Sequence, residues 1–177
     1  MQFTITVLAL LTMALPMTSA LTTRSADAIP NGGYTGETFA NGTTLYTPLE
    51  GGEPFLVEPS AAPVSAKLGK RYTGCFGGNL DRSGVDASVQ RLRNWAGNGR
   101  DLASGSVNTW VGFVNEATLA YYCINAPHRR GNLDVNDVNH ALREMDRVCG
   151  SYKSSYYKWD GSVEIVGKDY AGANICV

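Results

Sequence analysis

The clearest alternation of apolar and polar positions lies between Asp134 and Gly150. The apolar positions recur at helical spacing and form one face: Val135, Val138, Leu142, Met145 and Val148/Cys149. The charged positions Arg143, Glu144 and Arg147 fall mostly on the other side. Asp134 is the expected N-cap, with Asp137 three residues on, and Gly150 stops the pattern. These residues predict an amphipathic helix with one buried face.

A second helical stripe follows Asp81. Its apolar positions are Val85, Val89, Leu92 and Ala96. Asp81 and Ser83 are candidate N-caps, and Asp86 stands early, where the helix dipole favours an acid. Gly97 is expected to end the helix as a left-handed cap.

Aromatic and β-branched residues dominate the segments around these helices, which favours strands. The expected strands are a short one at 72–76, two hairpins at 107–124 and 152–166, and the end of a last strand at 173–177. Asn115-Glu116 and Asp160-Gly161 supply the turns. Residues 98–106 and 125–133 are expected to be loops. Two helices on one face of an antiparallel sheet predict an α+β two-layer sandwich.

The first 71 residues show no such pattern. Residues 1–20 look like a secretory signal peptide, with an apolar run and small residues Thr18 and Ala20 before the cut. A membrane anchor is the alternative, but the run is too short to span about 30 Å of hydrocarbon. Residues 21–71 are rich in Pro, Gly and Thr and contain no cysteine, so they are expected to be a largely disordered propeptide.

A basic pair, Lys70-Arg71, closes this stretch. It predicts cleavage by a kexin-type protease after Arg71, because processing sites lie in accessible segments. The alternative is a basic pair in an ordinary linker. A second pair, Arg129-Arg130, is expected to stay intact in an exposed turn. Asn41-Gly42-Thr43 matches an N-glycosylation sequon, whose glycan would leave with the propeptide.

All four cysteines lie after Arg71, at Cys75, Cys123, Cys149 and Cys176. An even number behind a signal peptide predicts two disulfides and a secreted, extracellular protein. Three pairings are possible. Cys75–Cys149 with Cys123–Cys176 is preferred, because each bond then ties an early element to a late one. A zinc site is disfavoured, since no C-x-x-C pair exists and His128 and His140 lack ligand spacing.

The charges and motifs of residues 72–177 argue against several function classes. This part has 11 Lys/Arg against 11 Asp/Glu, so no nucleic-acid partner is expected. It contains no G-x-S-x-G, P-loop or H-E-x-x-H motif, and we expect no cofactor, no metal and no enzymatic activity. His140 is interpreted as a solvated or half-buried helix residue.

The aromatic residues of 152–159 offer a candidate recognition patch. Alternation along a strand places Tyr157 and Trp159 on one face, and an exposed pair there would suit binding. The alternative is that both cover the sheet or the helices, as aromatic residues in strands usually do.

The order of elements resembles a known family, the killer protein 4 toxins of smut-fungus viruses and their fungal homologues. The resemblance is carried by Cys75, the first helix, the run Thr118-Leu119-Ala120-Tyr121-Tyr122, and the second helix leading into Arg147-Val148-Cys149-Gly150-Ser151. It implies a disulfide-stapled sandwich of antiparallel sheet and two antiparallel helices, without catalysis. The toxins have more cysteines and depend on a lysine that residues 107–111 lack, so no functional residue is carried over.

The sequence therefore predicts a secreted fungal effector or killer-toxin-like protein that binds a protein or membrane-protein target in a host or rival microbe. Cleavage after Arg71 would release it. A small secreted hydrolase and a structural cell-wall or surface protein are the alternatives.

Overall fold

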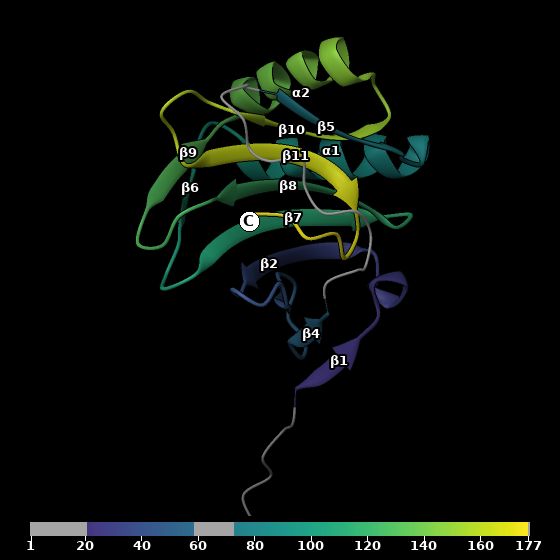
Figure 1. Cartoon of the computed structure of the whole chain (residues 1–177), viewed down its shortest axis with the longest axis vertical. Coiled ribbons are helices and arrows are strands. Elements are labelled where there is room, and N and C mark those ends of the chain that lie inside the picture. Colours follow the sequence, from purple (N-terminus) through teal and green to yellow (C-terminus); the bar gives the residue numbers. More distant parts are fainter. Residues whose placement is uncertain (1–20, 59–72, 177) are drawn as a thin grey trace, which may run out of the picture.

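The computed structural model describes residues 21–58 and 73–176, and within them the chain folds around one large sheet (Figure 1). The strands are β1 (Thr22–Arg24), β2 (Gly32–Thr38), β3 (Thr44–Pro48), β4 (Phe55–Val57), β5 (Thr73–Asn79), β6 (Arg100–Ala103), β7 (Asn108–Asn115), β8 (Thr118–Ile124), β9 (Arg130–Leu133), β10 (Lys153–Lys158) and β11 (Glu164–Tyr170). The helices are α1 (Arg82–Ala96), α2 (Val135–Cys149) and a 3-10 turn, Ala26–Ala28. In the described part, nine strands join in the order β1-β4-β3-β2-β7-β8-β11-β10-β5, mostly antiparallel, and the predicted α+β class is confirmed.

Helix α1 begins and ends where its capping residues predict. The Asp81 carboxylate accepts hydrogen bonds from the Gly84 backbone N–H at 2.8 Å and from the Ser83 hydroxyl at 2.6 Å. Gly97 follows the helix with a φ of 54°, and its N–H donates to the Arg93 carbonyl. The predicted apolar stripe is buried against the sheet.

Helix α2 carries a complete capping box. The Asp134 side chain accepts from the backbone N–H of Asp137 at 2.9 Å, and the Asp137 side chain accepts from that of Asp134 at 3.3 Å. Val138, Ala141, Leu142 and Met145 are buried beneath the helix, while Val148, at the end of the predicted stripe, is half exposed. Both helices therefore lie on one face of the sheet, as predicted, and Figure 1 shows α2 at the end of the molecule away from β1.

Three local predictions need correction. Residues 98–106 and 125–133, expected as loops, contain β6 and β9, which pair with each other from Arg100 opposite Leu133 to Ala103 opposite Arg130. Arg130 of the second basic pair thus stands in a strand. Residues 173–176 form no strand. Strands β6 and β9 depend on each other and lie far apart in sequence, so local pattern did not identify them.

Residues 22–57 overturn the prediction that the first part of the chain is largely disordered. They form β1 to β4, and β2 lies inside the sheet between β3 and β7. The prediction rested on composition, which indicates only how much apolar surface a segment can bury within itself. This segment instead buries its apolar side chains against the rest of the chain. The predicted signal peptide, residues 1–20, and the predicted cleavage site, Lys70-Arg71, lie outside the described residues.

The disulfides form in the preferred pairing. Cys75–Cys149 joins β5 to the end of α2, with 5.5 Å between Cα atoms. Cys123–Cys176 joins β8 to the C-terminal segment, with 5.8 Å between Cα atoms. All four cysteines are used, and both bonds lie within residues 73–176.

The sheet separates two cores. The first lies between the sheet and the helices and contains Val111 and Phe113 of β7. The second lies on the other face, where Trp110 and Val114 of β7 meet side chains of residues 21–58 and of the C-terminal segment. Strand β7 is buried on both faces. It therefore connects residues 21–58, the N-terminal segment, to residues 73–176, the part of the chain that contains both disulfides and that we call the cross-linked body.

Candidate functional site

The predicted recognition pair lies at the boundary of α2 and β10, but it is not an exposed patch. Tyr157 is buried, with 8% of its surface exposed, and Trp159 is half-buried against the helix-side core. Their rings meet edge to face, with centroids 5.0 Å apart. The packing alternative is therefore correct for Tyr157, and only Trp159 of this pair offers surface.

His140 of α2 joins this pair. Its Nε2 shares a hydrogen bond of 3.2 Å with the Tyr157 hydroxyl, and the two rings lie edge to face at 5.2 Å. His140 itself is exposed, as its interpretation as a solvated helix residue anticipated. We call His140, Tyr157 and Trp159 the surface cluster. It presents one imidazole and one half-buried indole over a buried phenol.

The glycosylation sequon stands in the turn between β2 and β3. Asn41 is exposed, and its side-chain oxygen accepts from the Thr43 backbone N–H at 3.0 Å. The Thr43 hydroxyl donates to Glu58 at 3.3 Å. Asn41 is therefore accessible at the surface of this turn, as glycosylation at this position requires.

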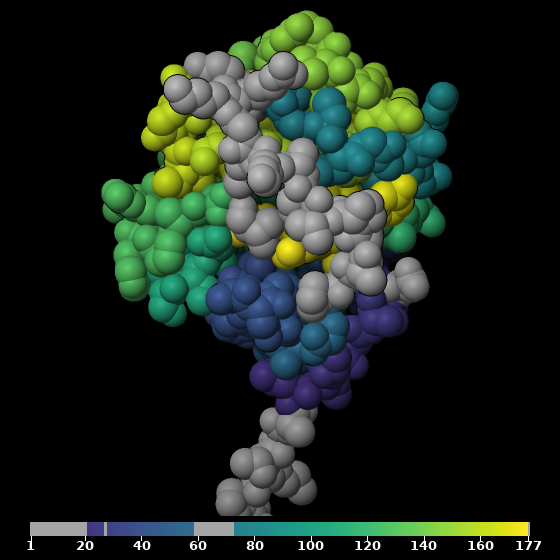
Figure 2. Space-filling model, viewed as in Figure 1, coloured from purple at the N-terminus to yellow at the C-terminus, as the bar shows by residue number. Residues whose placement is uncertain are grey.

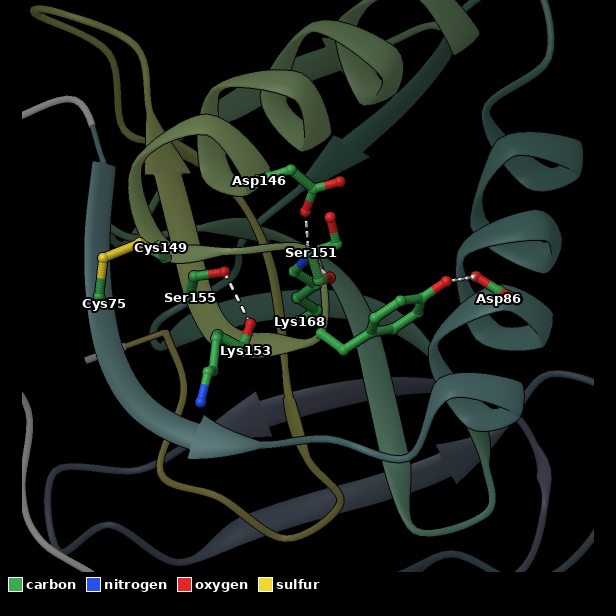
Figure 3. Close-up of polar contacts among 9 residues, drawn as sticks. Cys75, Asp86, Asp146, Cys149, Ser151, Lys153, Ser155 and Lys168 are labelled. Atoms are coloured by element: carbon green, nitrogen blue, oxygen red, sulfur yellow. Dashed lines mark hydrogen bonds and ion pairs between the residues drawn. A yellow bond between two sulfur atoms is a disulfide. The ribbon is translucent and has the colours of Figure 1, made fainter.

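A buried ion pair, which sequence reasoning missed, fastens α2 to the sheet (Figure 3). The Lys168 side chain on β11 is only 1% exposed, and its Nζ lies 2.5 Å from Asp146 Oδ1 on α2. The same Nζ donates to the carbonyl of Ser151, just beyond the helix. A cation there also complements the negative end of the helix dipole. The role is structural, because each polar atom named has a partner within the fold.

The main new feature is the insertion of β2 beside β7. The two strands pair antiparallel along their whole length, from Gly32 opposite Val114 to Thr38 opposite Asn108. We call the contact of residues 21–58 with β7 and with residues 171–176 the seam. Figure 2 shows the N-terminal segment, in purple to blue, forming one end of the molecule.

An aromatic cluster fills the seam. Trp110 of β7 is fully buried, and the Tyr46 ring of β3 meets it edge to face with centroids 4.9 Å apart. Phe55 of β4 stacks on Tyr46 at 5.5 Å, and Tyr34 of β2 meets Tyr46 at 5.6 Å. One ring of residues 21–58, that of Tyr46, therefore packs directly on the Trp110 indole, and the other two rings pack around Tyr46.

Two glycines of β2 set the register of the seam. A Cβ atom at Gly36 would lie 2.0 Å from the Trp110 ring, and one at Gly33 would lie 2.8 Å from the Phe113 ring. Each glycine stands directly opposite the aromatic residue that covers it. A shift of one residue in either direction would place Thr35 or Glu37, each with a side chain, opposite Trp110 in place of Gly36.

The C-terminal segment closes the seam from the other side. The Gly172 backbone N–H donates to the Tyr46 hydroxyl at 3.3 Å, and the Thr38 hydroxyl donates to the Ile175 carbonyl at 3.4 Å. The disulfide from Cys123 to Cys176 holds this segment in place. On the helix side, Arg91 of α1 forms an ion pair of 3.1 Å with Glu50.

Asp169 of β11 is a buried carboxyl group close to Tyr46 and Tyr121, which belong to the core on the seam side of the sheet. Its Oδ1 accepts hydrogen bonds from the Ser154 hydroxyl at 2.7 Å and from the Tyr170 backbone N–H at 2.8 Å. Burial raises the pKa of Asp169 above its usual value, although these two hydrogen bonds act in the opposite direction. Burial likewise raises the pKa values of Tyr46 and Tyr121, with the Asp169 charge adding to the effect.

This pKa shift gives a testable stability effect. A carboxyl whose pKa is raised on folding holds its proton more tightly in the folded state. The free energy of unfolding therefore falls as pH rises from the unfolded pKa through the folded one, by about 1.4 kcal/mol per pKa unit. In Asp169→Asn the amide oxygen can keep both hydrogen bonds without the charge. We expect this variant to be more stable than wild type at neutral pH, with the difference shrinking to zero below the unfolded pKa.

Urea unfolding of both proteins between about pH 3 and pH 7 measures this difference, with the disulfides intact. Gln90→Ala serves as a comparison, since it changes an exposed amide on α1 that donates to Asn94, and neither group titrates. A variant that loses stability at neutral pH would show that the Asp169 charge is required rather than tolerated.

The sequence did hold a signal for the seam. Thr44-Leu45-Tyr46-Thr47 and Phe55-Leu56-Val57 are β-branched and aromatic, and their buried residues alternate. The runs are short and separated by Gly and Pro, so they resemble loop composition.

Searches with this chain match no protein-family model, no curated protein and no solved structure. Within the described residues, no helix is long and apolar enough to cross a membrane, and no cluster of His, Cys, Asp and Glu could hold a metal ion.

Proposed function

We propose that this chain is a secreted fungal effector or killer-toxin-like protein that acts by binding a target on a host or rival microbe, after kexin-type cleavage behind Arg71. The observation that carries the proposal is the placement of both disulfides on the C-terminal side of Lys70-Arg71. A cut there would leave every cross-link within one chain. Disulfide-rich secreted proteins depend on such bonds to persist outside the cell.

The surface cluster is the contact region that we assign to binding. Trp159 presents an indole at the surface, and its orientation is fixed by the edge-to-face contact with Tyr157. Tryptophan residues on a rigid support are common anchors of protein interfaces, because they bury a large area at low entropic cost. The exposed imidazole of His140 adds a hydrogen-bonding group beside it.

The test uses the full chain, secreted and processed by a kexin-competent fungal host, then labelled and applied to plant tissue and to cells of competing fungi. Saturable binding is expected, and Trp159→Ala should lower it by about tenfold or more. Trp95→Ala is the matched control, because Trp95 is also a half-buried indole but lies on α1, beside Arg100. Its binding should stay near that of wild type.

Two results would overturn the proposal. One is the absence of saturable binding by the wild-type protein to every cell type tried. The other is turnover of a glycan, peptide or nucleotide substrate that disappears in His140→Ala, which would favour the hydrolase alternative.

A further inference from the structure

We propose that cleavage after Arg71 does not release the N-terminal segment: residues 21–58 stay inserted in the sheet, and the secreted protein is a noncovalent complex of two chains. The interaction surface is β7 with the core face around Trp110, and its occupant is this chain's own β1 to β4. The inference rests on the processing step of the proposed function. It departs from the usual fate of a propeptide, which is removal.

The position of β2 is the first reason. Strand order places β2 between β3 and β7, inside the sheet. If the segment left, β7 would become an edge strand along residues 108–115, with its outward N–H and C=O groups unpaired. A long, flat and apolar edge strand promotes aggregation, and β7 carries neither a charged residue nor a proline to prevent it.

The buried surface is the second reason. Tyr34, Tyr46 and Phe55 are at most 4% exposed. Side chains of this size bury about 150–250 Å² each, partly against one another and partly across the seam. Ile29 and Val57 are buried in the same core, and all seven residues of β2 pair with β7. Separation of the two chains would expose this apolar surface to water.

The fixed geometry of the seam is the third reason. Gly33 and Gly36 fit against Phe113 and Trp110 in one register only. On the other chain, the disulfide at Cys176 holds the segment that contacts Tyr46 and Thr38. The binding face is thus preorganised by a cross-link that cleavage after Arg71 does not affect, which lowers the entropic cost of keeping the segment bound.

The test uses the full chain secreted by a kexin-competent host and purified from culture fluid under native conditions. Native mass spectrometry should give one species with the mass of both chains, including any glycan on Asn41. Denaturing electrophoresis without reductant should give two bands, because no disulfide joins the two chains. Amides of 108–115 should exchange with deuterium as slowly as in uncut Arg71→Ala protein.

A native sample that contains folded 72–177 alone would overturn the inference, and so would fast amide exchange in β7 after cleavage. If the host leaves the Arg71–Tyr72 bond uncut, the processing step is wrong. The seam is then tested in a chain that carries a foreign protease site in place of residues 68–71. If the complex persists but binds no target, the proposed function fails and this inference stands.

A matched pair of variants probes the register. Gly36→Val places a side chain against the Trp110 ring, and after cleavage its two chains should separate at about 100-fold higher protein concentration than wild type. Glu37→Val changes the next residue, which is exposed, and should differ from wild type by less than about threefold. Equal behaviour of the two variants would contradict the role of Gly36. If Gly36→Val is not secreted, the test is the deuterium exchange of the β7 amides in cleaved wild-type protein: slow exchange supports the inference and fast exchange overturns it.

Discussion

A chain that begins at Tyr72 behind a secretion signal is expected not to reach a cooperatively folded, monomeric state. Without residues 21–58, Trp110 loses its contact with the Tyr46 ring, and one edge of β7 loses its hydrogen-bonding partner. Exposed apolar patches of this size drive association. We expect little secreted monomer, broad gel-filtration profiles and dye binding typical of exposed apolar surface.

The decisive control is complementation. Residues 21–58 co-expressed as a separate chain should restore secretion and the near-ultraviolet circular dichroism of buried aromatic rings. The same segment carrying Gly36→Val should restore much less, because its new side chain meets Trp110. A monodisperse 72–177 protein that unfolds cooperatively without the segment would show that the seam is dispensable for folding.

Asp146→Ala is expected to lower the free energy of unfolding by about 3–5 kcal/mol, because it leaves a buried ammonium group without a counter-charge. The two partners are buried unequally, with side-chain exposures of 1% for Lys168 and 39% for Asp146. Lys168→Met should therefore cost less, about 1–2 kcal/mol, since the remaining carboxylate can be solvated and the main loss is the hydrogen bond to Ser151. Asp146→Ala is expected to cost more than Lys168→Met because it leaves the buried Lys168 ammonium group without water or a counter-charge.

Glu144→Ala is the matched control on the same helix. Its carboxylate pairs with Arg147 at 2.7 Å, but the Arg147 side chain is 69% exposed, and exposed ion pairs contribute little to stability because water and salt screen them. Urea unfolding with the disulfides intact gives all three values. If Asp146→Ala and Glu144→Ala cost the same, the Lys168 pair is not a fastening contact of α2.

The seam bears on the proposed cleavage after Arg71. A disordered propeptide can be removed without consequence for the fold, whereas residues 22–57 supply four strands and part of a core. Cleavage after Arg71 would then break the peptide bond between the N-terminal segment and the cross-linked body, while the two remain packed together. The glycan expected at Asn41 would be retained on the secreted complex rather than lost with a discarded segment.

The sequence by itself determined the features that depend on neighbouring residues. The helices are capped by Asp81 and Asp134 at their starts and by Gly97 and Gly150 at their ends, and these caps could be predicted because they act within one helical turn. The hairpin β7–β8 follows from two apolar runs around a polar turn. The disulfide pairing was preferred on chain order, and the α+β class followed from these elements.

Only the tertiary structure decided the features whose partners lie far apart in sequence. Strand β2 pairs with β7, and β6 pairs with β9, although neither pairing leaves a local pattern strong enough to predict it. The burial of Lys168 depends on Asp146, and that of Tyr157 depends on where α2 packs. Short strands gain their stability from the neighbour that completes their hydrogen bonds and covers their side chains. In this chain the neighbour is β7. By pairing with β2 it holds the N-terminal segment in the sheet, where the side chains of that segment form part of the core.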